Sequence, residues 1–240
     1  MQCVVLAGGL ATRLGSLSSG TPKSLVKACG KPFIDYQLAL LARNGIDRAT
    51  YCIGHLGEQI RAHVGNGDRF GLRVDYVDEG DKRLGTAGAL RLALDTGALD
   101  DRVFVTFGDS YLPIFFRDVW VAAESVRPRP LMTVFRNEGR WDGSNVILQD
   151  RRVRLYEKGR QDTKAIGMAW IDYGLLVLER HHIETMIPAE MPFDLSDVCH
   201  RLSLAGVLEG FEVFTRFYEI GTPQGLADFE DLARRELSAK

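Results

Sequence analysis

The sequence has few cysteines and spaces them widely. The four are Cys3, Cys29, Cys52 and Cys199, and no two of them form the C-x-x-C pair of a zinc or thioredoxin-type site. We therefore expect each of them to be a small, buried, apolar residue in a reducing compartment. The five histidines show no metal-ligand spacing either, so the sequence predicts no histidine chemistry.

The sequence also lacks a long apolar run and a strong excess of either charge. Its longest apolar stretch, residues 174–178, is far shorter than the roughly 20 residues that span a bilayer, and no basic, apolar leader follows Met1. Lys and Arg number 30 against 32 Asp and Glu, and the resulting net charge of −2 argues against a nucleic-acid-binding groove. We expect a cytoplasmic protein that binds neither membranes nor nucleic acids.

What the sequence does contain is an alternation of short apolar or β-branched runs with helical periods. This pattern predicts an α/β fold, with a Rossmann-like mixed, mostly parallel central sheet flanked by helices in a single globular unit. The expected strands are at 3–6, 49–53, 72–77, 103–107, 131–135, 146–148, 153–156, 166–171, 175–178 and 212–217. The expected helices are at 32–44, 57–64, 87–94, 113–124 and 193–204, with a last one from 223 onward.

A loop of small residues follows the first expected strand. Residues 6–14 read LAGGLATRL, and Pro22-Lys23 follow. Small residues after a buried strand let backbone N–H groups approach a phosphate, and Arg13 and Lys23 add positive charge. The loop has neither the G-K-[ST] of a Walker A site nor the G-x-G-x-x-G of a dinucleotide fingerprint. The whole array favours phosphate binding over a surface turn with two solvated cations.

Other segments place polar residues where a ligand could meet them, and each has a plainer alternative. Asp109, in Phe107-Gly108-Asp109-Ser110, could merely cap the next helix. Glu157-Lys158 could be a solvated pair, and residues 142–145 (DGSN) a hairpin turn. Asp172 interrupts an apolar strand and needs a partner, which is either a sugar hydroxyl or the backbone.

Taken together and in this order, the segments resemble the signature of the sugar-1-phosphate nucleotidyltransferases, L-A-G-G-x-G-[ST]-R-[LM] followed by P-K. Residues 84–90 (LGTAGAL), 107–110 (FGDS), 157–159 (EKG) and 219–223 (EIGTP) match later elements of that family. The resemblance spans residues 6 to 223. This sequence departs from the family pattern at Ala11, where glycine is usual, and at Glu219, where aspartate is usual.

The resemblance implies a set of site residues. It implies nucleotide contacts at Leu6, Ala7, Gly8, Gly9, Ala11, Thr12, Arg13, Lys23, Gly85, Thr86, Ala87 and Gly108. It implies acceptor contacts at Gly143, Asn145, Glu157, Lys158 and Asp172, and Mg²⁺ ligands at Asp109 and Glu219. Arg13, Lys23 and Asp109 would carry catalysis. We expect one nucleotidyltransferase domain over residues 1–240, with a nucleotide-binding half at 1–112 and a sugar-phosphate-binding half at 113–240.

The implied reaction is Mg²⁺-dependent transfer of a nucleotidyl group from a nucleoside triphosphate to a sugar 1-phosphate, releasing pyrophosphate. Residues 85–88 and 141–146 resemble guanylyltransferases acting on mannose or heptose phosphates, which favours GTP while leaving UTP, dTTP and CTP open. A homo-oligomer is possible.

Three other functions compete with this one. The first is a cytidylyl- or uridylyltransferase for phosphocholine or an amino-sugar 1-phosphate. An aromatic cage built from Trp141, Trp170 and Tyr173 would be the mark of a phosphocholine site. The second is a non-catalytic sugar-nucleotide-binding module. The third, an NAD-dependent oxidoreductase, is disfavoured by the missing glycine fingerprint.

Overall fold

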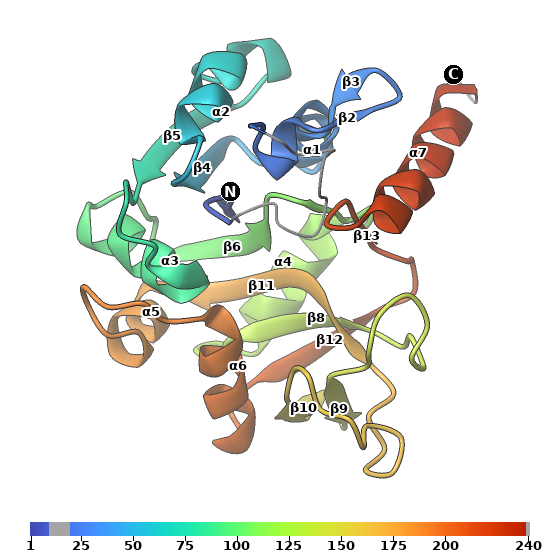
Figure 1. The fold of residues 1–240 in the computed structure, drawn as a ribbon. Helices are drawn as coiled ribbons and strands as arrows, with labels where there is room; N and C mark the ends of the chain where they lie inside the picture. Colours follow the sequence, from blue (N-terminus) through green and yellow to red (C-terminus); the bar gives the residue numbers. More distant parts are fainter. Residues whose placement is uncertain (10–19, 239–240) are drawn as a thin grey trace.

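A nine-stranded sheet runs through the computed structural model of the chain, which describes residues 1–9 and 20–238 (Figure 1). The strand order is β5-β4-β1-β6-β11-β8-β12-β10-β9. Four of these strands are β1 (Gln2–Leu6), β4 (Arg48–Ile53), β5 (Arg73–Asp78) and β6 (Arg102–Phe107). The other five are β8 (Leu131–Phe135), β9 (Val146–Gln149), β10 (Arg152–Tyr156), β11 (Ile171–Glu179) and β12 (Glu209–Val213).

The sheet is mixed in direction. The pairs β5-β4, β4-β1, β1-β6 and β8-β12 are parallel, whereas β11 and β10 run against their neighbours. The order β5-β4-β1-β6 corresponds to the third, second, first and fourth of these four strands in the chain, which is the doubly wound order. In such sheets ligands bind where the order reverses, here between β1 and β6.

Helices cover both faces of the sheet. The helices are α1 (Phe33–Arg43), α2 (Gly57–Val64), α3 (Gly85–Asp95), α4 (Phe116–Ser125), α5 (Arg180–Met186), α6 (Leu195–Leu204) and α7 (Pro223–Ser238). One buried cluster joins the sheet to α1, α2 and α4, and a second joins its other face to α3, α5 and α6. Between the two clusters, the central strand β1 is covered on both faces, and all five of its residues are buried.

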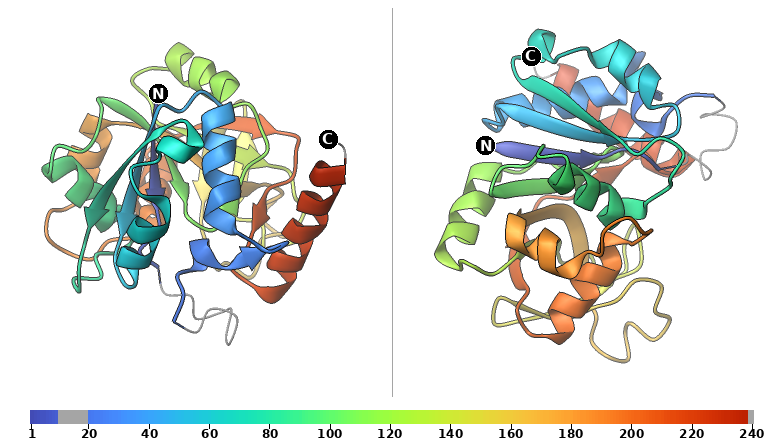
Figure 2. Two further views of the ribbon diagram at one scale, coloured as in Figure 1. Left: turned by 90° about the horizontal axis from the view of Figure 1, so that it is seen from above. Right: turned by 90° about the vertical axis from the view of Figure 1, so that its left-hand side faces the viewer.

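Helix α7, from the last part of the chain, packs against α1, from the first part. It lies beside α1 (Figure 2), where the Phe229 ring meets Phe33 edge-on, with 4.9 Å between the ring centroids. Short elements complete this corner: β2 (Lys27–Ala28) pairs with β3 (Lys31–Pro32), and β7 (Ser110–Tyr111) with β13 (Tyr218–Glu219). Two 3₁₀ turns, η2 (Lys23–Leu25) and η3 (Asp68–Phe70), also occur.

The expected fold class is confirmed, and most expected elements occur within a few residues of their expected bounds. Two expected strands were wrong, and one helix was not expected. Residues 166–170 are not a strand, because β11 begins at Ile171 and continues through Glu179 as one strand. The strand expected at 212–217 lies at 209–213, since Gly210 and its neighbours pair with β8. Helix α5, which the sequence analysis did not anticipate, directly follows β11. Within the described residues, no helix combines the length and apolar character needed to cross a membrane.

Candidate functional site

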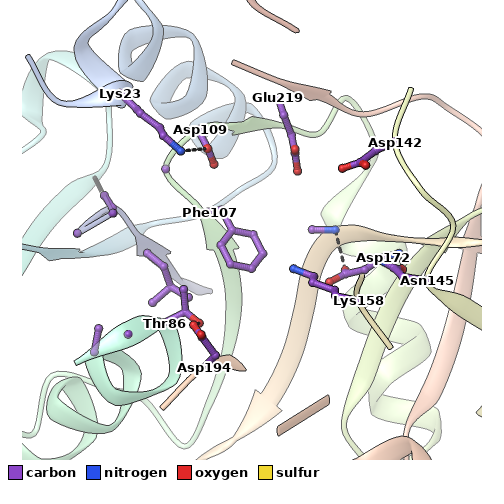
Figure 3. A pocket seen from close by; sticks show the side chains of 18 of the residues that line it. Lys23, Thr86, Phe107, Asp109, Asp142, Asn145, Lys158, Asp172, Asp194 and Glu219 are labelled. Carbon is purple, nitrogen blue, oxygen red and sulfur yellow. Dashed lines mark hydrogen bonds and ion pairs between the residues drawn. The ribbon is translucent and has the colours of Figure 1, made fainter. Parts of the chain in front are cut away.

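A cavity of about 960 Å³ opens at the carboxyl ends of β1 and β6. Its walls come from both halves of the chain: the loops after β1, β5 and β6, the start of α3, and segments around β9, β10 and β11. Figure 3 shows the polar side chains that converge on it. The doubly wound part of the sheet therefore places a cavity at the switch point between β1 and β6.

Glycine lets a carboxylate reach the end of β1. A Cβ atom on Gly8 would lie 2.5 Å from Glu79 Oε1, and one on Gly54 would lie 2.6 Å from the same atom. The other oxygen of Glu79, Oε2, accepts a hydrogen bond of 2.8 Å from the Leu84 backbone N–H. Burial raises the pKa of the Glu79 carboxyl above its usual range, and the hydrogen bond from Leu84 partly offsets this. The carboxylate is thus fixed beside the phosphate-loop backbone.

Asp109 follows β6 and is held from several directions. The buried Gln37 side chain of α1 donates hydrogen bonds of 2.8 Å to the carbonyl oxygens of Phe107 and Ser110, on either side of Gly108-Asp109. The Ile220 N–H donates to the Asp109 carbonyl oxygen at 3.0 Å, next to the antiparallel β7–β13 pair. This pairing aligns Glu219 with Ser110, so two carboxylates more than 100 residues apart in sequence face the same space (Figure 3).

Lys23 reaches the same place from η2. Its Nζ lies 3.1 Å from Asp109 Oδ2, with side-chain exposures of 18% and 21%. Pro22 precedes the turn and its carbonyl oxygen accepts the Leu25 N–H at 2.9 Å, which sets the direction in which the chain presents Lys23. The expected Pro-Lys element therefore meets the expected metal carboxylate directly.

The electrostatics around Glu219 favour a cation. Desolvation, followed by the negative charge of Asp109, raises the pKa of Glu219 to about 7, and Lys158 opposes the shift. Two oxygen ligands of this kind suit Mg²⁺, which binds one or two carboxylates together with phosphate oxygens and water. The residues present therefore fit a magnesium ion.

Asp172 and Asn145 form the opposite wall. The Asp172 N–H donates to Asn145 Oδ1 at 2.9 Å, and the Gly174 N–H donates to Asp172 Oδ1 at 2.9 Å. Gly174 has φ +96°, and the register with β8 shifts between Asp172 and Leu176. Glycine permits this irregularity, which turns Asp172 into the cavity. Burial raises the pKa of Asp172, whereas the nearby Lys158 lowers it.

Lys158 comes from the loop after β10. Its ammonium lies 5.8 Å from the centre of the Phe107 ring, so it reaches across the cavity toward the end of β6. The loop is held by hydrogen bonds from Glu157 N–H to Asn145 O (2.9 Å) and between His200 Nδ1 and Tyr156 O (2.6 Å). Lys158 forms no ion pair within the described residues, so its charge faces the cavity.

The start of α3 is covered by residues 191–195. The Phe193 carbonyl oxygen accepts the N–H groups of Ala87 and Gly88 at 2.9 and 3.1 Å. The Thr86 hydroxyl donates to Asp194 Oδ1 at 3.0 Å and accepts the Leu195 N–H at 2.7 Å. These groups already have hydrogen-bond partners in the protein. A ligand bound beside this loop would therefore contact the outer surface of the loop and not the first N–H groups of α3.

Most of the expected site residues that the structure describes line this cavity. They are Leu6, Ala7, Gly8, Gly9, Lys23, Gly85, Thr86, Gly108, Asp109, Gly143, Asn145, Lys158, Asp172 and Glu219. Ala87 and Glu157 are not among the lining residues: Ala87 is buried in α3, and Glu157 accepts from Arg160 at 2.8 Å. Ala11, Thr12 and Arg13 lie outside the described residues.

Two acidic lining residues, Glu79 and Asp194, were not expected from the sequence, and Asp142 belongs to the expected DGSN segment but had no assigned role. Glu79 directly follows β5, and the strand-end rule that identified Asp109 could have identified it as well. Asp194 had no such signal, because its position depends on how residues 191–195 pack against α3. The suggested aromatic cage is absent from the described residues: Trp141, Trp170 and Tyr173 do not line the cavity. The Trp170 indole N–H instead donates to Glu212 at 2.7 Å.

Comparisons with known proteins agree with the resemblance. The family model described as nucleotidyl transferase matches residues 2–136. A D-glycero-α-D-manno-heptose 1-phosphate guanylyltransferase from Aneurinibacillus thermoaerophilus is 31% identical over 166 residues, covering 66% of this chain and 68% of that protein. A CMP-5'-(3-aminopropyl)phosphonate synthase from Streptomyces rubellomurinus is 32% identical over 160 residues, covering 63% of this chain and 25% of that protein.

Among solved structures, HddC from Yersinia pseudotuberculosis complexed with GMP-PN has a TM-score of 0.75 and is 27% identical, covering 95% of this chain and 96% of that one. The chain spans about a third of the length of the first curated relatives that it matches. The family match nevertheless covers more than half of the chain, and the fold and the heptose-phosphate relative agree with it. This chain therefore belongs to the nucleotidyl transferase family.

Proposed function

We propose that the chain transfers a nucleotidyl group from a nucleoside triphosphate, with GTP preferred, to a sugar 1-phosphate. The observation that carries the proposal is that two carboxylates, which suit a metal ion, and two lysines, which suit phosphates, lie along one cavity. Asp109, Glu219 and Lys23 meet at one end, and Lys158 extends from the other half of the chain toward them. Residues 1–112 would hold the nucleotide, and residues 113–240 would supply most contacts to the acceptor.

The reaction needs positioning more than acid–base chemistry. A phosphate oxygen of the sugar phosphate attacks the α-phosphorus, the bond from that phosphorus to the β-phosphate oxygen breaks, and pyrophosphate leaves. The attacking oxygen is already anionic at neutral pH, so the protein must bring two polyanions together and stabilise the charge of the transition state. Lys23 would bind the triphosphate and Lys158 the acceptor phosphate, and the family resemblance assigns Arg13 to the leaving pyrophosphate.

Asp109 and Glu219 would hold a Mg²⁺ ion. When bound, the ion neutralises phosphate charge and orients the α-phosphate for in-line attack. The chain's own contribution is to keep the two carboxylates together through the β7–β13 pair and the Gln37 hydrogen bonds.

Glu79 supports the preference for GTP. A carboxylate only accepts hydrogen bonds, and guanine presents adjacent N1–H and N2–H donors, whereas uracil and thymine present mainly carbonyl oxygens along the same edge. Glu79 Oε2 is fixed by Leu84, and the carboxylate lines the nucleotide side of the cavity. Glu79→Gln would then reduce the preference for GTP over UTP, while Glu58→Gln, at an exposed acid on α2, would leave it unchanged.

A second candidate acceptor is an amino-sugar 1-phosphate or another phosphate that carries an amine. Asp142 and Asp172 line the acceptor side of the cavity, and Lys158 from the loop after β10 acts electrostatically on Asp172 there. This surplus of negative charge would attract an ammonium group. A relative that is named for a 3-aminopropylphosphonate product is consistent with such an acceptor. The missing aromatic cage disfavours phosphocholine.

The test is pyrophosphate release with Mg²⁺ and each of GTP, UTP, dTTP, CTP and ATP. The acceptor panel contains mannose, glucose and heptose 1-phosphates, glucosamine 1-phosphate, 3-aminopropylphosphonate and phosphocholine. Turnover with GTP and a neutral sugar phosphate supports the proposal, and turnover confined to the amine-bearing acceptors supports the second candidate. Nucleotide binding without turnover across the panel would contradict both and favour a binding module.

A further inference from the structure

The Asp109 carboxylate, an expected ligand of the metal ion, already has a positively charged partner in the protein, the ammonium group of Lys23. Lys23 Nζ lies 3.1 Å from Asp109 Oδ2, and both side chains are largely withdrawn from solvent. Figure 3 shows this pair beside the Glu219 carboxylate, which forms no ion pair within the described residues. Without a ligand, the ammonium group therefore neutralises one of the two carboxylates that a divalent ion would need.

The carboxylates alone also make an incomplete metal site. Among the described residues, no group of three or more His, Cys, Asp or Glu side chains could hold a metal ion. Two carboxylates leave most positions of an octahedral ion to water and phosphate oxygens. Both observations point the same way: a free divalent ion meets two ligands, one of them already paired.

We propose that Lys23 is a resident counter-ion of Asp109 and makes divalent-ion binding depend on the nucleotide. This inference rests on the metal assignment of the proposed function. The triphosphate offers Lys23 a stronger partner than one carboxylate does, and the flexible four-carbon stem lets the ammonium group move to it. Asp109 is then free, and the phosphate oxygens complete the ligand set. One lysine would serve first as the counter-ion of Asp109 and then, once the nucleotide binds, as a phosphate ligand.

The experiment measures Mn²⁺ binding to the nucleotide-free protein, with free Mn²⁺ quantified by electron paramagnetic resonance. Lys23→Met removes the charge and keeps most of the side-chain volume. We expect this variant to bind Mn²⁺ about tenfold more tightly than the wild type, because a partly buried charge next to the ion is gone. Lys23→Arg keeps the charge and should bind Mn²⁺ as weakly as the wild type.

Lys158→Met is the matched control. Lys158 lines the same cavity and lowers the pKa of Glu219, but it does not pair with Asp109. A general loss of positive charge would strengthen Mn²⁺ binding equally in both variants, whereas occupation of the site by Lys23 predicts a much larger change at Lys23. Thermal unfolding checks that each variant is folded, and Lys23→Gln replaces Lys23→Met if the latter is not.

The result that overturns the inference is a Mn²⁺ affinity of Lys23→Met no greater than that of the wild type, or an equal gain in Lys158→Met. The wild-type enzyme assay with GTP, Mg²⁺ and the acceptor panel separates this failure from failure of the proposed function. Turnover by a wild type that also binds Mn²⁺ tightly without nucleotide would reject only the counter-ion. No turnover and no nucleotide binding would reject the function itself.

Discussion

The two walls of the cavity are built in different ways. On the nucleotide side, Gly8, Glu79 and Asp109 follow the parallel strands β1, β5 and β6, whose carboxyl ends lie along one edge of the sheet, so the three residues converge there. On the acceptor side, Asp172 depends on an irregularity in β11, and Glu219 on a two-residue pairing with β7. The positions of the side chains on the first wall follow from the order of the strands along the chain, whereas those on the second wall depend on contacts between residues far apart in the sequence.

The two walls should therefore respond differently to substitution. A substitution on the nucleotide wall changes a side chain at the end of a strand that the sheet holds in place. It should alter catalysis or binding with little effect on folding. A change on the acceptor wall can alter both, because the local backbone conformation carries the side chain.

Asp109→Asn should have the largest effect. The amide keeps the shape of the side chain but removes the charge that would hold the metal ion, and we expect turnover to fall by roughly 10²- to 10³-fold. Stability should change little, because the Asp109 backbone contact to Ile220 remains. Pyrophosphate release in saturating Mg²⁺ measures the effect.

The matched control is Asp78→Asn, at the end of β5 but outside the cavity lining. It removes a carboxylate from the end of a parallel strand in the same sheet and should leave turnover close to that of the wild type, because Asp78 does not line the cavity. Near-wild-type turnover of Asp109→Asn would show that the charge at the end of β6 is not used in catalysis.

Lys158→Met should have the second-largest effect, and this effect should fall mainly on the KM of the acceptor. Loss of a charged phosphate contact should raise the KM of the acceptor by roughly 10- to 100-fold, with a smaller effect on the KM of the nucleotide. Arg160→Met is the comparison, because Arg160 also lines the cavity but is held by Glu157 and Asp162 at 2.8 and 2.5 Å. Equal effects of the two variants on both substrates would argue against Lys158 as the acceptor ligand.

Gly174→Ala should disturb the acceptor wall through the backbone. Gly174 has φ +96°, and a non-glycine residue in a left-handed conformation costs roughly 1–2 kcal/mol. Relaxation of that strain should move Asp172 and raise the KM of the acceptor by roughly tenfold, since small misplacements are costly in a positioned site. Chemical denaturation and steady-state kinetics measure the two effects separately.

Gly206→Ala provides the matched backbone control. Gly206 has φ +68° and open space around it, and it lies outside the cavity lining. It should lose a similar amount of stability and keep its acceptor KM. If Gly174→Ala behaved like this control, the irregularity in β11 would have no role in placing Asp172.

The same contrast explains what could be predicted from the sequence. The alternation of strands and helices before Asp109 predicted the parallel part of the sheet correctly. It also placed Gly108-Asp109 at the carboxyl end of β6, where the cavity lies. The errors lie in the second half, where Gly174 keeps β11 in one strand despite a polar residue and where β12 ends at Val213. Periodicity describes local burial, and it carries no information on which distant strand supplies a hydrogen-bond partner. Asp194 was missed because its place in the site depends on the packing of residues 191–195 against α3, and Glu219 was found through the family resemblance.

The smallest predicted effect concerns α5, which the sequence analysis also missed and which lies away from the cavity lining. His182 Nδ1 accepts the Glu179 N–H at 3.1 Å at the start of this helix, so the neutral ring caps it. Burial, followed by the charge of His181, lowers the pKa of His182 from 6.5 to about 4. The unfolded chain therefore binds a proton more readily than the folded one between these values, and stability should fall as the pH drops from about 6.5 toward 4.

His182→Asn should flatten that part of the pH–stability curve by on the order of 1 kcal/mol, because asparagine can accept the same hydrogen bond without titrating. His55→Asn, at an exposed histidine, should leave the slope unchanged. Chemical denaturation at pH 7.5, 6, 5 and 4 measures the slope. Acceptor KM should stay the same in both variants, because α5 supports the sheet without contributing to either wall. An unaltered slope in His182→Asn would mean that the carboxylates dominate acid unfolding, and a changed KM would mean that α5 and the acceptor wall are coupled.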